Sequence, residues 1–225
     1  MTMPSTDLHV DALLLDMDGT LVDSTASVER SWRAWALQHD LVPGEILAAA
    51  HGVPALATIR KFAPAGTDVA AEAHALVTAE LEDTNGIVPI PGAAALLQAL
   101  PEGKWAVVTS AGRRLALQRM QAAGLAIPKI LISADDVQKG KPDPEGYRTA
   151  ARLLGVAPSQ CLVIEDTPAG LEAGRRAGAA LIGVCTTYTP AHLCGSHDIV
   201  TVPDLSSLKI SVLSDGRIRI MVHTA

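Results

Sequence analysis

Two carboxylates lie at the end of a short apolar run near the start of the chain. Residues 12–15 are apolar, and Asp16 and Asp18 follow, just before Gly19. A buried strand that ends at unpaired carboxylates is strongly disfavoured, and a hard divalent cation bound by their oxygens removes the penalty. On an extended backbone residues two apart face the same ligand, and Gly19 permits a sharp turn beyond them. The pattern predicts a metal-assisted site at a strand end, with an ordinary Asp-Gly turn as the alternative.

Three further polar features follow later in the chain. Thr109 and Ser110 end an apolar run before a helical stretch, where hydroxyls and free N–H groups cradle a phosphate or simply cap the helix. Lys141 precedes a proline that holds its backbone extended, so its ammonium can be aimed at a phosphate or a nucleophile; a solvated surface lysine is the alternative. Glu165 and Asp166 end a second buried run, which strengthens the case for a shared cation.

Short apolar strands alternate with helical stretches over most of the chain, which predicts an α/β fold with a parallel sheet. The expected strands are 10–16, 105–109, 130–133, 161–165 and 181–184, and the expected helices are 92–100, 112–124, 144–155 and 168–177. Ligands of such sheets bind beyond the carboxyl ends of the strands. We therefore expect the later polar features to converge on Asp16.

Residues 24–85 interrupt this alternation with helical patterns alone. The expected helices are 27–39, 43–50, 54–62 and 69–84. We interpret residues 23–85 as an inserted helical domain and residues 1–22 and 86–225 as the core; helices that belong to the core are the alternative. The tail alternates around Asp215-Gly216, which predicts a hairpin over 210–222 that extends a sheet edge.

Composition excludes several classes of protein. The 225 residues are 48% hydrophobic with a net charge of −6, which is globular and does not suit a general nucleic-acid binder. Three cysteines without a CxxC pair predict neither a disulfide framework nor a structural zinc site, and favour a reducing cytoplasm. Residues 1–10 lack signal-peptide features, and no apolar run reaches membrane-spanning length. We expect a cytoplasmic protein without nucleic-acid or membrane partners.

The ordered series of motifs resembles the haloacid dehalogenase superfamily of phosphatases and phosphotransferases. The matching positions are Asp16–Thr20, Thr109, Lys141 and Glu165–Asp166. The resemblance implies a doubly wound, Rossmann-like core, and the helical insert looks like the small helical cap of that family. Segments 51–54, 59–64, 104–110 and 135–142 look most like the glycerol-phosphate and 2-deoxyglucose-6-phosphate phosphatases.

The resemblance also implies roles for the matching residues. Asp16 would be the nucleophile that forms an aspartyl phosphate, and Asp18 would protonate the leaving alkoxide and then deprotonate water. Mg²⁺ would be held by Asp16, the backbone carbonyl of Asp18 and Asp166, while Glu165 either orients the metal waters or serves as a ligand. Thr109 and Lys141 would hold the transferring oxygens.

Substrate choice is expected to lie around the cap. Ser110, Arg113 and His51 are the candidate substrate-binding residues, and a surface loop histidine is the alternative for His51. Trp32 and Trp35 are expected in the core of the cap rather than stacked on a sugar. The expected partner is a small phosphorylated metabolite, and the expected state is a monomer or weak dimer.

Three rival functions are compatible with the same fold. A phosphomutase of the β-phosphoglucomutase group would carry a cap histidine and a cap arginine, where this chain has Val28 and Ala55. A true dehalogenase lacks the second acid, which is present here as Asp18. A non-catalytic phosphosugar-binding module is the alternative of another class, and the intact motifs disfavour it.

Overall fold

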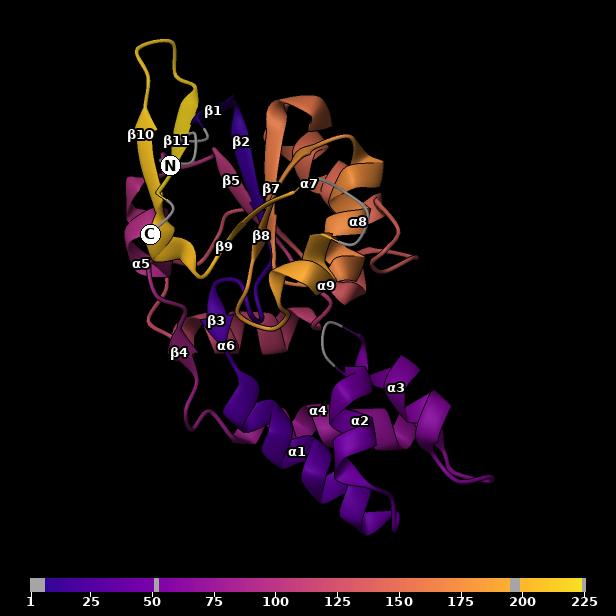
Figure 1. Cartoon of the computed structure of the whole chain (residues 1–225). Helices are drawn as coiled ribbons and strands as arrows, with labels where there is room; N and C mark the ends of the chain where they lie inside the picture. Colours follow the sequence, from indigo (N-terminus) through magenta and orange to yellow (C-terminus); the bar gives the residue numbers. More distant parts are fainter. Residues whose placement is uncertain (1–6, 51–52, 195–198, 224–225) are drawn as a thin grey trace.

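The computed structural model describes residues 7–50, 53–194 and 199–223. Six parallel strands form the central sheet in the order β6-β5-β2-β7-β8-β9 (Figure 1). Their bounds are β2 Ala12–Leu15, β5 Trp105–Val108, β6 Leu131–Ile132, β7 Cys161–Glu165, β8 Ala180–Val184 and β9 Val200–Val202. The strand β2 lies between β5 and β7, with Leu15 opposite both Val107 and Ile164, so these three strands end at the same edge.

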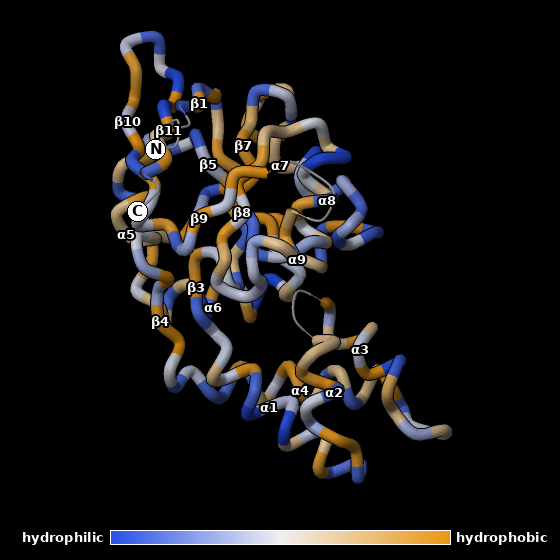
Figure 2. The backbone as a smooth tube through the Cα atoms, viewed as in Figure 1, coloured by the Kyte–Doolittle hydropathy of each residue, from blue (hydrophilic) through white to orange (hydrophobic). Residues whose placement is uncertain are grey.

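Helices cover both faces of this sheet. On one face lie α5 (Ala93–Ala99) and α6 (Arg113–Ala122), and on the other α7 (Glu145–Leu154) and α8 (Pro168–Ala177); α9 (Pro190–Cys194) follows β8. Leu13 and Leu15 pack into the first core cluster and Leu14 into the second, as alternation along a strand requires. Figure 2 shows the hydrophobic colouring concentrated along the central strands. The prediction of a doubly wound α/β fold is confirmed.

Four helices are inserted between β3 (Val22–Asp23) and β4 (Val88–Pro89), two short strands that pair antiparallel. They are α1 (Thr25–Gln38), α2 (Pro43–Ala50), α3 (Ala55–Phe62) and α4 (Val69–Glu82), and we refer to them as the inserted helices. They share a hydrophobic cluster of their own, which contains Trp32 and Trp35. The prediction that these tryptophans belong to the core of the insertion is confirmed. Figure 1 places the inserted helices beyond α6 and β3.

The C-terminal hairpin forms as predicted, but it does not extend the central sheet. The strands β10 (Leu208–Val212) and β11 (Ile218–Val222) join β1 (Asp7–Val10) in a separate sheet of order β1-β11-β10. The predicted strand 10–16 is accordingly broken at Asp11. The hairpin has one apolar face, with Ile218 and Ile220 buried in the first core cluster. An alternating pattern suits a sheet covered on one face, whereas a strand of the parallel sheet must be apolar on both.

Within the described residues, no helix has the length and apolar character needed to cross a membrane.

Candidate active site

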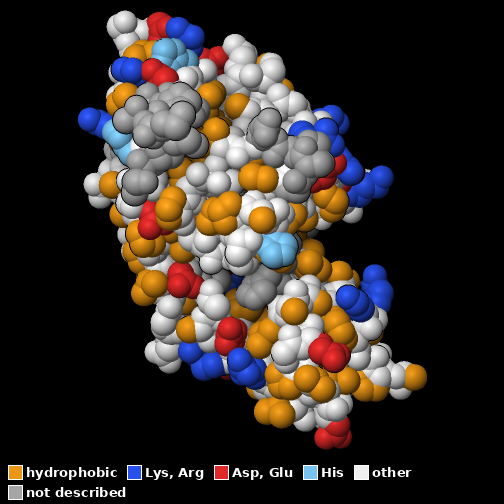
Figure 3. Space-filling view, viewed as in Figure 1, with side chains coloured by type: hydrophobic (Ala, Val, Ile, Leu, Met, Phe, Trp, Pro, Cys, Tyr) orange, Lys and Arg blue, Asp and Glu red, His pale blue; other side chains and the backbone are white. Residues whose placement is uncertain are grey.

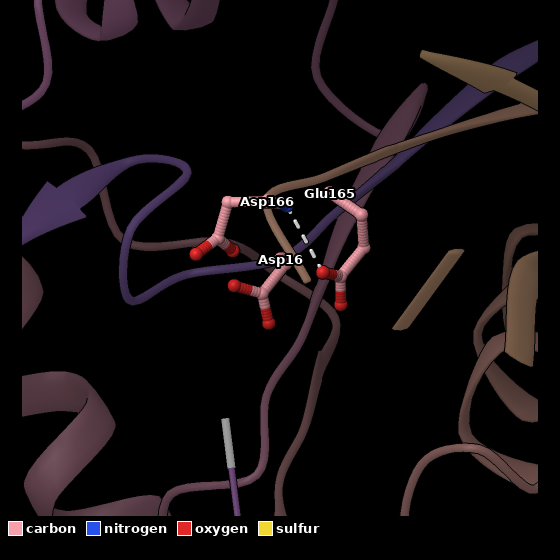
Figure 4. Close-up of side chains that lie close together, drawn as sticks. All are labelled: Asp16, Glu165 and Asp166. Carbon is pink, nitrogen blue, oxygen red and sulfur yellow. Dashed lines mark hydrogen bonds between the residues drawn. The ribbon is translucent and has the colours of Figure 1, made fainter. Parts of the chain in front are cut away.

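Three carboxylates meet at the carboxyl end of the central sheet. Asp16 follows β2, and Glu165 and Asp166 lie at the end of the neighbouring β7. Each offers an oxygen within 4.8 Å of the other two, and all three residues are buried (Figure 4). The convergence expected from the sequence is therefore present.

Lys141 supplies the positive charge of this cluster. Its Nζ donates hydrogen bonds to Asp16 Oδ1, to Glu165 Oε1 at 2.5 Å and to the carbonyl oxygen of Val108 at 3.1 Å. Burial alone would lower its pKa, but the charges of Asp16 and Glu165 hold the pKa of Lys141 well above its ordinary value. Lys141 is thus a buried ammonium aimed at the predicted nucleophile, and a solvated surface lysine is excluded.

The cluster holds three carboxylates against one ammonium, and the acids respond to this imbalance. Burial raises the pKa of Asp16 well above its ordinary value, although the Lys141 charge opposes the rise. Burial and then the charge of Glu165 raise the pKa of Asp166 to about 7. A divalent cation among these oxygens would remove the penalty, and an all-oxygen donor set suits a hard cation. The residues present therefore fit a bound hard divalent cation.

Both carboxylate oxygens of Glu165 already accept hydrogen bonds from other groups of the protein. Its Oε1 accepts from Lys141 and from the hydroxyl of Tyr147 at 3.0 Å, and its Oε2 accepts from the N–H of Asp166 at 3.0 Å and from the N–H and hydroxyl of Thr167 at 2.9 Å. A Cβ at Gly170 would lie 1.7 Å from Oε1, so the first turn of α8 closes tightly over this carboxylate. These contacts favour the interpretation of Glu165 as a group that orients Lys141 and Asp166 rather than a ligand.

The Asp-Gly turn that follows β2 packs directly against the acidic cluster. Gly19 has a φ of +82°, and a Cβ there would lie 2.1 Å from Asp166 Oδ2. The hydroxyl of Thr20 donates to Asp166 Oδ1 at 3.1 Å. The turn after β2 therefore folds directly against Asp166, and only glycine permits that approach.

Thr109 and Ser110 follow β5 and face the same space. Thr109 is buried, and its Oγ1 accepts the N–H of Ala111 at 3.0 Å. The N-cap of α6 is Gly112, which has no side chain to cap the helix. The two hydroxyl residues therefore do not cap α6, and both line the cavity described next.

A cavity of about 140 Å³ lies between the strand ends and the inserted helices. Asp16, Asp18 and Lys141 line its core side, and Val28 and Ala55 line its helical side. An adjoining cavity of about 570 Å³ shares Lys141 and Ala55 with the first and continues along the loops that follow β5 and β6. Figure 3 shows the surface notched between the inserted helices and the core. The cluster is thus open to a small molecule held between the two parts.

One of the residues expected to bind substrate, Arg113, is not brought to this cavity. The Arg113 side chain donates to the carbonyl oxygen of Leu131 at 2.8 Å and to Asp136 Oδ2 at 2.7 Å, and it lines neither cavity. It begins α6 on an exposed face, where the acidic turn at 134–136 captures it. His51 lies outside the described residues.

The sequence interpretation missed a second ion-pair group around Asp18. Ser24 donates to Asp18 Oδ1 at 2.6 Å, and Arg119 Nη1 donates to Asp18 Oδ2 at 2.8 Å. Arg119 Nη2 also donates to Glu80 Oε2 at 3.1 Å. Burial raises the pKa of Glu80 above its ordinary value. One signal was available: Arg119 lies on the helix face that carries the buried Leu115, where an arginine needs partners.

Comparison with known proteins agrees with this geometry. The model of the haloacid dehalogenase-like hydrolases matches residues 10–178. Hexitol phosphatase A of Escherichia coli (strain K12) is 45% identical over 79% of this chain and 84% of its own. In Saccharomyces cerevisiae, 2-deoxyglucose-6-phosphate phosphatase 2 is 31% identical over 95% of this chain and 96% of its own. Glycerol-1-phosphate phosphohydrolase 2 of the same yeast is 36% identical over 84% and 80%.

A solved structure supports the same assignment. The crystal structure of a hydrolase from Pseudomonas syringae superposes with a TM-score of 0.74 at 27% identity and covers 87% of this chain and 94% of that one. The resemblance seen in the sequence motifs, including the resemblance to the sugar and glycerol phosphatases, is confirmed. The chain is an enzyme that belongs to the haloacid dehalogenase-like hydrolases.

Proposed function

We propose that this enzyme is a magnesium-dependent phosphatase that hydrolyses a small sugar or polyol phosphate monoester. The observation that carries the proposal is the buried cluster of Asp16, Asp166 and Lys141, which opens into a cavity under the inserted helices. The names of the three relatives, which refer to hexitol, 2-deoxyglucose 6-phosphate and glycerol 1-phosphate, support the substrate class.

Asp16 is the proposed nucleophile. Lys141 binds its Oδ1, which leaves Oδ2 to attack phosphorus and form an aspartyl phosphate. Asp18 lies two residues further on in the same cavity and gives its proton to the departing alkoxide. It then takes a proton from the water that hydrolyses the aspartyl phosphate. Two acids divide the roles of nucleophile and acid because their environments differ, one buried and one partly exposed.

Asp16, the backbone carbonyl of Asp18 and Asp166 would hold the magnesium ion. When bound, the ion neutralises the repulsion between the carboxylates and the phosphate dianion. Thr109, Ser110 and Lys141 surround the remaining phosphate oxygens from the side of β5 and the loop before α7. Residues 23–85, which contain the inserted helices, act as a cap. The cap closes over the substrate and excludes water until the alcohol has left.

Hydrolysis is favoured over phosphoryl transfer between sugar positions. A mutase must bind a second phosphate at the far side of the cavity, and the helices present the apolar Val28 and Ala55 there. The charged residue that those helices contribute to the described lining is Glu80, and the neighbouring Arg119 is already paired with Glu80 and Asp18, so it is not a free cation for a second phosphate. The cavity therefore suits a leaving group that is neutral and hydroxylated.

A substrate screen tests the proposal. Purified enzyme with Mg²⁺ is assayed for inorganic phosphate released from glycerol, hexose, deoxyhexose, hexitol and pentose phosphates, with Asp16→Asn as the inactive control. Release from one or more of these esters supports the proposal. Interconversion of β-glucose 1-phosphate and glucose 6-phosphate without release would favour the mutase. Saturable binding of esters without turnover would favour the non-catalytic binding module.

A further inference from the structure

A buried arginine connects the inserted helices to the predicted proton donor. Arg119 of α6 reaches Asp18 through Nη1 at 2.8 Å and Glu80 of α4 through Nη2 at 3.1 Å. Its side chain is 6% exposed, and its Nε has no hydrogen-bond partner among the described residues. Neither Arg119 nor Glu80 belongs to the cluster around Asp16, and the proposed phosphoryl transfer gives neither group a part in bond making or breaking.

Arg119 forms an ion pair across the boundary between the inserted helices and the core. Within residues 7–50, 53–194 and 199–223, the only salt bridge between the inserted helices and the core is Arg119–Glu80. The neighbouring Gln118 donates to the carbonyl oxygen of Leu81, so α6 and α4 are joined at two adjacent points. A shift of α4 away from the core therefore removes one of the two carboxylates that neutralise a buried guanidinium.

Both carboxylate oxygens of Asp18 accept hydrogen bonds from residues at the boundary between the inserted helices and the core. Oδ2 is held by Arg119, which Glu80 fixes from behind, and Oδ1 is held by Ser24, which immediately precedes α1. A carboxylate held through both oxygens has a defined orientation, and general acid catalysis requires the donor to lie within hydrogen-bond reach of the leaving oxygen. The orientation of Asp18 is thus set by where the inserted helices lie.

We propose that Arg119 is a positioning residue for Asp18, and that its bridge to Glu80 makes proton donation depend on closure of the inserted helices over the substrate. Closure seats Glu80 on Arg119, and Arg119 then fixes Asp18 for the leaving alkoxide. When the helices open, Arg119 loses Glu80 and Asp18 loses its fixed orientation. The inference rests on the proposed phosphatase function and deepens it.

The test compares two leaving groups. A polyol ester such as glycerol 1-phosphate expels an alkoxide that needs a proton, whereas p-nitrophenyl phosphate expels a phenolate that leaves without one. The steady-state kcat on the polyol ester reports the positioned acid. The pre-steady-state burst of p-nitrophenolate reports the attack of Asp16 alone.

Arg119→Lys keeps the positive charge but cannot bridge two carboxylates in one plane. We expect it to lower kcat on the polyol ester by about 10- to 100-fold, less than the ~10²–10⁴ that general acid–base catalysis supplies in full. We expect the p-nitrophenolate burst to stay within about 3-fold and KM within about 2-fold of the unchanged enzyme, since Arg119 does not hold the phosphate. Glu80→Gln keeps the shape of the side chain but removes its charge. We expect it to lower kcat on the polyol ester by about 3- to 10-fold.

Arg114→Lys and Glu82→Gln are the matched controls, because both residues are exposed on the same two helices. Both should keep the kinetics of the unchanged enzyme. Equal losses with the two leaving groups, or a rise in KM at constant kcat, would overturn the positioning role. If Arg119→Lys fails to fold, Glu80→Gln carries the same comparison. An unchanged enzyme without turnover on either ester would instead refute the proposed function.

Discussion

Replacing a proposed metal ligand should make the metal-free enzyme more stable. Asp166 is 1% exposed and lies beside Glu165 in the acidic cluster. Burial and then the Glu165 charge raise its pKa from 3.8 to about 7. Without a cation, the ionised side chain therefore destabilises the folded state. Asp166→Asn keeps the shape of the side chain and removes that charge.

The direction and the magnitude of the stability change follow from the pKa of Asp166. Below pH 3.8 the carboxyl is protonated in both states and contributes nothing. Between that pH and about 7 the unfolded chain ionises first, so the folded state loses stability as the pH rises, and above about 7 the penalty is complete. About three pKa units at ~1.36 kcal/mol each give a ceiling of about 4 kcal/mol. Asp16 shares the cluster, so we expect a gain of about 2–4 kcal/mol at high pH.

Urea and thermal unfolding in chelator measure this gain. We expect Asp166→Asn to match the unchanged protein near pH 4 and to exceed it near pH 8, where about 2–4 kcal/mol corresponds to a rise in Tm of roughly 5–15 °C. Added Mg²⁺ should stabilise the unchanged protein by about 2.7 kcal/mol at a hundred-fold excess over its Kd, and the variant far less. Glu82→Gln, on an exposed part of α4, serves as the control that removes a carboxylate without burial.

Two results would refute this reasoning. If the Asp166→Asn variant is less stable than the unchanged protein near pH 8 in chelator, Asp166 is not an uncompensated buried charge. Equal stabilisation of both proteins by Mg²⁺ would show that the ion binds elsewhere.

Three further predictions concern the site. Asp16→Asn should lower the rate of phosphate release by several orders of magnitude, and retention of more than a few per cent would exclude Asp16 as the nucleophile. Excess chelator should abolish activity reversibly, and Ca²⁺ in place of Mg²⁺ should inhibit because its looser coordination misplaces the phosphate; full activity in chelator would contradict the metal requirement. Gly170→Ala should lower the free energy of unfolding in urea by about 3 kcal/mol, because the new Cβ would lie 1.7 Å from Glu165 Oε1. An unchanged urea midpoint would show that α8 can shift to accommodate the Cβ at little cost.

The sequence was sufficient to predict five of the six strands of the central sheet and the acidic cluster, while the edge strand β9 was not among the expected strands. Apolar runs that end in Asp16 and in Glu165–Asp166 identify both strands and their ends, because few interiors tolerate carboxylates there. Parallel strands place those ends at one edge, which brings the two acidic ends together without knowledge of the strand order. Lys141 was a candidate because a proline fixes its backbone, but only its place in the ordered motif series distinguished it from a solvated surface lysine.

The contacts that the sequence could not supply depend on tertiary packing. The motifs do not indicate that α4 crosses α6, so the pairing of Glu80 with Arg119 has no local signature. Arg113 and Arg119 look alike on one helix, yet the turn at 134–136 captures the first and the buried face of α6 directs the second to Asp18. The hairpin at 208–222 was visible from its alternation, but its choice of partner depended on which face of the core remained uncovered.

For the proposed reaction, the distribution of charge along the cavity would allow one site to hold an anion and release a neutral alcohol. At one end, Lys141 and the proposed ion together would balance the three carboxylates, and the phosphate would bind there. The other end carries Asp18 and Glu80, and a single guanidinium, that of Arg119, is shared between them. A substrate with a second phosphate would find no free cation among the described residues at that end, whereas hydroxyl groups can donate to the two carboxylates. In the proposed mechanism, the ion-pair group of Asp18, Arg119 and Glu80 would thus serve both substrate choice and the orientation of the proton donor.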